Sequence, residues 1–199
     1  MLVNLAAIFF GVFIFLFIFW KKMKEDYAAE IIFKSATYIL TGMVIGFLIS
    51  KSFFAEWFLY AEFFGVIVGV YFAMVRFRLK FYEILDSTIL AFLPWFSLMF
   101  LSDSVTHLSF DSFMGFLFML VVIFLYYYFD THYRNFSWYK SGRVGFSGLI
   151  SLAIIFIARS AIATFGITVI SFVSKYEAIV SGLLAFITFL MLFRLSRKS

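Results

Sequence analysis

Long runs of apolar residues alternate with short polar stretches along the chain. A helix needs about 20 mostly apolar residues to cross the hydrocarbon core of a bilayer. The pattern predicts seven such helices, over Met1–Trp20, Ser35–Phe54, Ala61–Val75, Ile84–Leu101, Phe113–Phe129, Gly145–Phe165 and Tyr176–Phe193. Strands of a membrane barrel would instead alternate in units of about ten residues. The sequence therefore predicts an all-α polytopic membrane protein, with a single seven-helix transmembrane domain over residues 1–199.

The positive charges between these runs predict the orientation of the helices, because cytoplasmic connections are enriched in Lys and Arg. A seven-span arrangement brings most of the cations to one side of the membrane, namely Lys21, Lys22, Lys24, Lys34, Arg76, Arg78, Lys80, Arg134, Lys140, Arg143, Arg194, Arg197 and Lys198. The opposite side has Lys51 and Lys175, and Arg159 lies within a span. We therefore expect the N-terminus outside and the C-terminus in the cytoplasm.

The composition agrees with a membrane protein and removes several alternatives. Hydrophobic residues make up 65% of the 199 residues and charged residues 14%, whereas soluble domains have about 45–50% and about 25%. The net charge of +5 comes from short clusters between apolar runs, so a nucleic-acid partner is not expected. Because the chain has no cysteine, disulfides and cysteine-based metal sites are excluded. We expect neither a metal nor another cofactor, since no motif for one is present.

Two local patterns predict how parts of the bundle pack. The second span contains Gly42-x-x-x-Gly46 and the third contains Gly65-x-x-x-Gly69, a spacing that lets helices approach closely in lipid. A glycine face that admits a lipid chain is the functional alternative. At the inner side, Asp86 lies one turn into the fourth span, where an acid favours the N-terminal end of its own helix dipole. Nearby aromatic residues predict an interfacial belt, formed by Tyr126, Tyr127, Tyr128, Tyr133, Trp138 and Tyr139.

Few residues could carry chemistry, because ionisable side chains inside a membrane are costly and rare. Arg159 is the clearest candidate, roughly 9 Å of helix from the outer end of its span at 1.5 Å per residue. Its guanidinium either snorkels outward to phosphates or faces the bundle and holds a phosphate or carboxylate. Glu62, Asp103 and His107 lie at the outer ends of other spans. They are acid–base candidates, and the alternative is that they are polar residues of short outer loops.

Three stretches together resemble one bacterial enzyme family. In chain order they are "ILTGMVIGFLISKSFF", "FYEILDSTILAFLP" and "GRVGFSGLISLAIIFIARSAI", and they are similar to spans of prolipoprotein diacylglyceryl transferases. Asp86 and Pro94 fall in corresponding places, and Arg159 matches an essential arginine of the family. The resemblance implies seven spans in the bacterial cytoplasmic (inner) membrane, with the N-terminus outside. It also implies transfer of diacylglycerol from phosphatidylglycerol to the cysteine of a prelipoprotein signal peptide.

The resemblance assigns roles to the outer residues. Arg159 would hold the headgroup phosphate, and Glu62, Asp103 or His107 would act as acid–base group on the acceptor thiol. The chain also departs from the family pattern. Phe64 stands where the family has a histidine, and "WFSLMFLSDSV" replaces a glycine–arginine motif, so that Phe100 or Leu101 occupies the place of a second arginine. These features predict a divergent diacylglyceryl transferase. The alternatives are a non-catalytic member of the fold that binds lipid or a membrane partner, and a small transporter.

Overall fold

The computed structural model describes residues 2–53, 57–136, 139, 142–164 and 176–197. Its helices are α1 (Leu2–Met23), α2 (Ala29–Phe53), α3 (Phe58–Phe77), α4 (Phe81–His107), α5 (Phe110–His132), the short 3-10 helix η2 (Tyr133–Asn135), α6 (Phe146–Thr164) and α7 (Tyr176–Ser196). The seven α-helices are all long and apolar enough to cross a membrane, and the described ranges contain no strand. The predicted seven-helix, all-α architecture is therefore confirmed.

Most helices extend beyond the predicted apolar runs. The second begins at Ala29, before the predicted Ser35, and the fourth continues to His107. Apolar runs mark the part of a helix in hydrocarbon, whereas long charged side chains keep their heads in water and let the helix continue into the interface. In the added segment of α2, Lys34 and Glu30 form an ion pair of 2.5 Å. The predicted ends Met1, Phe54 and Phe165 lie outside the described residues.

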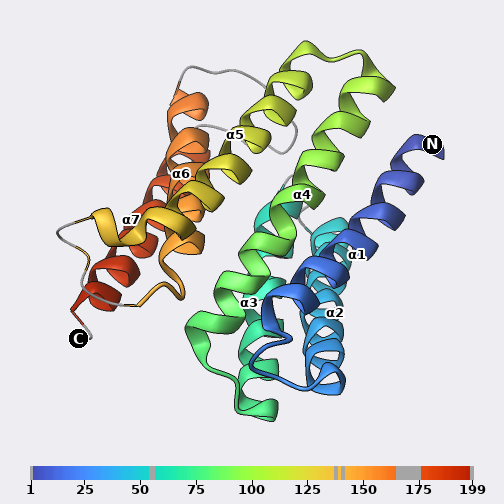
Figure 1. Cartoon of the computed structure of the whole chain (residues 1–199). Helices are drawn as coiled ribbons and strands as arrows, with labels where there is room; N and C mark the ends of the chain where they lie inside the picture. The colour runs from blue at the N-terminus through green and yellow to red at the C-terminus, as the bar shows by residue number, and fades with distance from the viewer. Residues whose placement is uncertain (1, 54–56, 137–138, 140–141, 165–175, 198–199) are drawn as a thin grey trace.

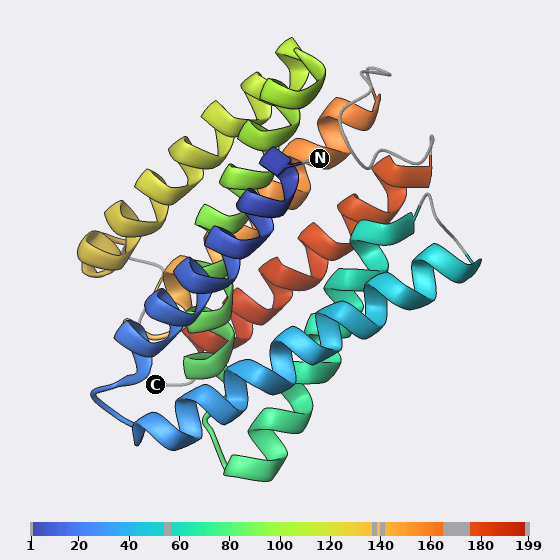
Figure 2. The same cartoon turned by 90° about the vertical axis from the view of Figure 1, so that its right-hand side faces the viewer.

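The helices pack mainly as antiparallel pairs, α2 with α3, α1 with α4, and α6 with α7, and α5 packs against α4 and α6. The start of α1 and the end of α7 lie at opposite ends of the bundle (Figure 1). The α2–α3 pair runs along one side of the bundle and α5 along the opposite side (Figure 2). We call the end with the α1–α2, α3–α4 and α5–α6 connections the basic end. The far end holds the end of α2, the start of α3, the α4–α5 turn, the end of α6 and the start of α7.

Glycines bring the backbones of α2 and α3 into direct contact, as the spacing predicts. A Cβ on Gly42 would overlap the carbonyl oxygen of Gly65, and one on Gly46 would overlap the carbonyl oxygen of Ala61. Gly69 packs in the same way on the backbone of Tyr38. Neighbouring backbone thus fills the glycine face, which leaves no room there for a lipid chain. Close backbone approach of this kind stabilises helix pairs in lipid.

We expect Gly42→Ala to destabilise the protein by about 1–3 kcal/mol, because the added methyl group forces two packed backbones apart. Unfolding of the purified protein by increasing SDS in mixed micelles measures the change. Gly142→Ala is the matched control, since a Cβ on Gly142 would meet no atom within 4 Å. Equal stability of the two variants would contradict this account of the α2–α3 contact.

Aromatic side chains of α1 and α4 form much of the central core. Phe15 and Phe19 are fully buried, and their rings stack with centroids 5.6 Å apart. Trp95 lies beside Phe92 on α4, with centroids 5.7 Å apart, and its ring lies against Gly11 of α1, where a side chain would not fit. Such rings bury large areas, and α4, the most buried of the seven helices, lies at the centre of the bundle.

A buried polar cluster joins α1, α4, α5 and α6 at the basic end, with Asp86 at its centre. Asp86 is 1% exposed. Its Oδ1 accepts a hydrogen bond from the backbone N–H of Gly148 at 2.9 Å, and its Oδ2 accepts one from the Tyr126 hydroxyl at 3.0 Å. Lys22 Nζ lies 3.3 Å from the same Oδ2. The carboxylate thus satisfies a first-turn N–H of α6, a contact that the position of Asp86 near the start of its own helix does not predict.

Asp130 balances the charges of this cluster. Arg143 donates to Asp130 through Nε at 3.0 Å and also through Nη2. Lys22 Nζ lies 3.4 Å from Asp130 Oδ1, so it contacts both aspartates. The hydrogen bond from Arg143 to Asp130 raises the pKa of Arg143, which keeps the guanidinium charged. Two carboxylates thus face two cations, and the attraction between them holds four helix ends together.

The expected aromatic belt at the membrane interface is wrong for Tyr126. Its side chain is fully buried inside the bundle, because its hydroxyl is the donor to Asp86. Tyr127 and Tyr128 are exposed at the surface of α5, as an interfacial belt requires. Trp138, another predicted member, lies outside the described residues.

Candidate functional site

Arg159 faces the interior of the bundle near the far end. It lies in the second half of α6, which ends at Thr164, and it is 8% exposed. A guanidinium that snorkelled to the interface would be largely exposed. Of the two orientations that the sequence leaves open, the structure therefore has the inward one.

Glu177, in the first turn of α7, is the ion-pair partner of Arg159. Its side chain is fully buried. The Nε and Nη2 atoms of Arg159 both donate to Glu177 Oε1, at 2.9 Å and 2.7 Å. Removing two charges from water costs several kcal/mol per ion, and their attraction offsets this cost only where further hydrogen bonds support them. The neighbouring hydroxyl groups supply that support.

Two hydroxyl groups complete the contacts of Glu177 Oε1. The Tyr60 hydroxyl donates to this oxygen at 2.5 Å, and the Ser181 hydroxyl donates to it at 3.1 Å. The two hydroxyl oxygens lie 2.8 Å from each other. Glu177 and Ser181 share one face of α7 because they are four residues apart, whereas Tyr60 comes from α3. The site thus connects α3, α6 and α7, with the Arg159 guanidinium 5.8 Å from the centre of the Tyr60 ring.

The second oxygen of Glu177 has a different environment. Oε2 is buried and has no hydrogen-bond partner among the described residues. A buried acceptor without a donor costs about 1–3 kcal/mol, and more when it is charged. The donors among the described residues are therefore directed at one oxygen of this carboxylate, and the other can accept a hydrogen bond from a ligand that carries an N–H, O–H or S–H group.

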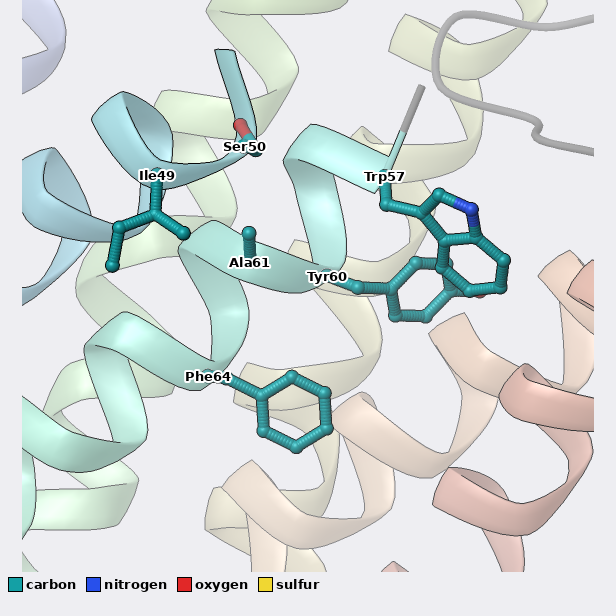
Figure 3. A pocket seen from close by; sticks show the side chains of 6 residues that line it. All are labelled: Ile49, Ser50, Trp57, Tyr60, Ala61 and Phe64. Atoms are coloured by element: carbon teal, nitrogen blue, oxygen red, sulfur yellow. The ribbon is translucent and has the colours of Figure 1, made fainter. Parts of the chain in front are cut away.

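An apolar groove adjoins the site at the far end of α2 and α3. It is a shallow, open groove of about 400 Å³, lined by Ile49, Ser50, Trp57, Tyr60, Ala61 and Phe64 (Figure 3). The rings of Trp57 and Tyr60 lie with their centroids 5.6 Å apart, and both point away from α2, toward the side of α6 and α7 (Figure 3). Tyr60 therefore belongs both to the wall of the groove and to the Glu177 site.

Glu62 lies on α3, close to this groove, but it is not a partner of Arg159. Its side chain is partly exposed, and it forms no ion pair or hydrogen bond with any described residue. Its Cα packs beside Gly46 of α2. The structure therefore places Glu62 in the same region as Arg159 without joining the two side chains.

Asp103 and His107 lie in the last turns of α4, beside the α4–α5 turn. Asp103 Oδ2 accepts a hydrogen bond from the Ser112 hydroxyl of α5 at 2.5 Å, and His107 Nε2 lies 3.7 Å from Asp103 Oδ1 within α4. His107 is exposed, and neither residue forms an ion pair with Arg159. Asp103 therefore links α4 to α5, and the acid–base role of both residues stays a prediction.

No functional role of Glu177, Tyr60 or Ser181 is predicted from the sequence. The sequence does contain a signal for Glu177, because this acid lies at the start of the last apolar run, at the same end of the bundle as Arg159. An intramembrane arginine requires an anionic partner, and Ser181 follows one turn later on the same helix face. No pattern in the chain indicates that Tyr60 turns inward, because aromatic residues line all faces of α3.

Together these features define a seven-span α-helical protein with a buried arginine–glutamate pair near one end and a charge-balanced cluster at the other. Comparison adds no family to this description, because no family model, no curated protein and no solved structure matches the chain. The resemblance to prolipoprotein diacylglyceryl transferases therefore stays a prediction.

Proposed function

We propose that this protein binds an anionic phospholipid at the far end of α3, α6 and α7, and that it is a divergent diacylglyceryl transferase. In this proposal the diacylglycerol of phosphatidylglycerol is transferred to the cysteine of a prelipoprotein signal peptide. The far end faces the outside of a bacterial cytoplasmic membrane, with the N-terminus on that side. The observation that carries the proposal is the inward-facing, buried Arg159 beside an apolar groove.

A buried arginine in this position suits a phosphate ligand. Its planar guanidinium matches the oxygen geometry of phosphate and of carboxylate equally well. An anionic headgroup can therefore replace Glu177 as the partner of the Arg159 guanidinium. The groove beside Tyr60 offers apolar walls for part of an acyl chain. A phospholipid would thus find complementary surfaces for both of its parts.

The chemistry that follows is a displacement at the glycerol carbon that bears the phosphate. The acceptor sulfur attacks this carbon, and the carbon–oxygen bond to the phosphate breaks. Negative charge then grows on the leaving glycerol phosphate, and a fixed cation stabilises such charge most when water is excluded. Arg159 fills this role in the proposal. Since Phe100 or Leu101 stands at the place of the family's second arginine, one cation acts where the family has two.

A second candidate is a non-catalytic member of the fold that binds a phospholipid or a membrane partner. The contacts of Asp103 and His107 favour it, because Asp103 accepts a hydrogen bond from Ser112 of α5 and His107 contacts Asp103 on its own helix. Neither lies in an ion pair with Arg159, so neither is placed to act on a thiol bound there.

Lipid modification of a reporter prelipoprotein tests the two candidates. In cells depleted of their own diacylglyceryl transferase, we expect this protein to add one diacylglyceryl group per reporter molecule, detected by mass spectrometry. Arg159→Lys keeps the positive charge but loses the planar guanidinium with its paired N–H donors. We expect this variant to lower the fraction of modified reporter by about 100-fold.

Arg194→Lys is the control for this experiment, since Arg194 is exposed in the last turn of α7. Full modification by Arg159→Lys would contradict the role of Arg159. An unmodified reporter at matched levels of the wild-type protein would overturn the transferase proposal and favour the non-catalytic candidate.

A further inference from the structure

The carboxylate of Glu177 is bound very unequally at its two oxygens. Oε1 accepts hydrogen bonds from Arg159, Tyr60 and Ser181. Oε2 accepts none from the described residues, although it is buried. The polar groups around Glu177 therefore orient the carboxylate and leave its second oxygen as the available acceptor. This is the arrangement of a proton acceptor held by its neighbours.

We propose that Glu177 Oε2 takes the proton of the acceptor thiol. This inference rests on the transferase function proposed above, and it replaces the acid–base assignment of Glu62, Asp103 and His107. None of those three residues forms an ion pair with Arg159, whereas Glu177 contacts it directly. The acceptor class is thus a peptide thiol, which has to reach the same buried site as the phospholipid phosphate.

The exchange of partners at Arg159 couples binding of the lipid phosphate to transfer of the thiol proton. As long as Arg159 pairs with Glu177, two guanidinium N–H groups donate to Glu177 Oε1. When a lipid phosphate takes over the guanidinium, the carboxylate loses these hydrogen bonds and its cation. Binding of the lipid thereby releases Glu177 from Arg159 at the moment when the thiol arrives.

The step balances without an oxidant or a reductant. The thiol proton moves to Glu177 Oε2, and the sulfur forms a bond to the glycerol carbon. The bond from that carbon to the phosphate oxygen breaks, and its electron pair stays with the oxygen. Glycerol phosphate leaves from Arg159 and carries away the proton that Glu177 releases. The carboxylate then pairs with Arg159 again.

The test measures transfer by the purified protein in vesicles that contain phosphatidylglycerol, with a synthetic prelipoprotein peptide whose single cysteine is the acceptor. Because the protein has no cysteine, the loss of thiol reports on the peptide alone. At pH 7 we expect Glu177→Gln to lower the rate by about 100-fold to 10,000-fold, the range for a general base. Glu30→Gln is the control, since Glu30 is fully exposed at the other end of the bundle.

The pH dependence separates proton transfer from a structural role. A cysteine thiol ionises near pH 8.5, so above that pH the thiolate forms without a base. We expect the deficit of Glu177→Gln to shrink by at least about tenfold between pH 7 and pH 9.5. A deficit that stays constant with pH, or a normal rate at pH 7, would overturn the role of Glu177 while leaving the transferase function in place. A wild-type protein without any transfer would overturn both proposals.

Glu177→Asp decides the question if the glutamine variant does not assemble. It keeps the ion pair but withdraws the second oxygen from its position, so we expect a rate at least about tenfold below wild type with a wild-type pH profile. A wild-type rate for Glu177→Asp would overturn the proposed position of the proton acceptor.

Discussion

Replacing Arg159 by methionine is expected to destabilise the protein by about 3–5 kcal/mol, because Glu177 would remain as a fully buried charge without a partner. Arg159 is the described cation in contact with that carboxylate. Methionine fills a similar volume, so the loss reports on charge more than on packing. Unfolding by SDS in mixed micelles measures the free-energy difference. Arg194→Met, at an exposed site of α7, should change the stability by less than about 1 kcal/mol.

Removing both charges should restore most of this stability. Arg159→Met combined with Glu177→Leu replaces a buried ion pair by apolar side chains of similar volume, a change that is often neutral or stabilising. Tyr60 and Ser181 would then keep each other as hydrogen-bond partners, at the 2.8 Å that already separates their oxygens. A double variant as unstable as Arg159→Met would show that the pair does not account for the loss. We expect lipid binding and transfer to be lost in both variants.

Asp86→Ala is the second change with a large expected effect, about 3 kcal/mol or more. It leaves two buried donors without an acceptor, the Tyr126 hydroxyl and the Gly148 N–H, and each such group costs about 1–3 kcal/mol. It also leaves Lys22 and Arg143 with Asp130 alone to balance two positive charges. Because the cluster joins four helices, we expect faster proteolysis at the basic end as well as a lower midpoint of SDS unfolding.

Asp26→Ala is the control for this prediction, since Asp26 is an exposed aspartate in the α1–α2 connection at the same end. Its replacement should change the stability by less than about 0.5 kcal/mol. If Asp86→Ala and Asp26→Ala had the same small effect, the cluster would not be what holds the four helix ends together.

The two clusters show why a membrane protein can be stable with so few charges. Apolar burial contributes little to association of helices in lipid, since lipid tails are as apolar as the helix faces. Close backbone contact at Gly42 and Gly65 and polar contacts at the two ends therefore carry much of the specificity. The Asp86–Asp130 cluster and the Arg159–Glu177 pair each combine opposite charges, which limits the cost of placing these charges inside the bundle.

The architecture could be predicted from the sequence because lipid imposes simple rules. Unbroken apolar runs of sufficient length indicate helices, and paired glycines four residues apart indicate where two of them touch. The positions of Gly42 and Gly65 are accordingly predicted well. Helix ends are predicted less well, because interfacial residues such as Glu30 stay helical although they are charged.

The candidate site could be predicted only in part. Arg159 stands out because an arginine inside an apolar run is rare. Its partner could not be chosen from sequence, since several acids lie at the same end and the rotation of each helix decides which one turns inward. Glu177 turns inward to Arg159, whereas Asp103 serves the α4–α5 turn. The partner of Asp86 could not be predicted either. Its position in the sequence suggests an effect on its own helix, whereas the structure brings the start of α6 beside it.

The transfer reaction itself tests the central claim most directly. Purified protein in vesicles of phosphatidylglycerol, or of phosphatidylethanolamine alone, is incubated with the cysteine-containing prelipoprotein peptide, and the peptide mass is measured. We expect the peptide to gain one diacylglyceryl group, with release of glycerol phosphate, only in the phosphatidylglycerol vesicles. We also expect this gain to require Arg159. An unchanged peptide mass in phosphatidylglycerol vesicles, with the protein folded and in excess, would contradict the proposed transfer.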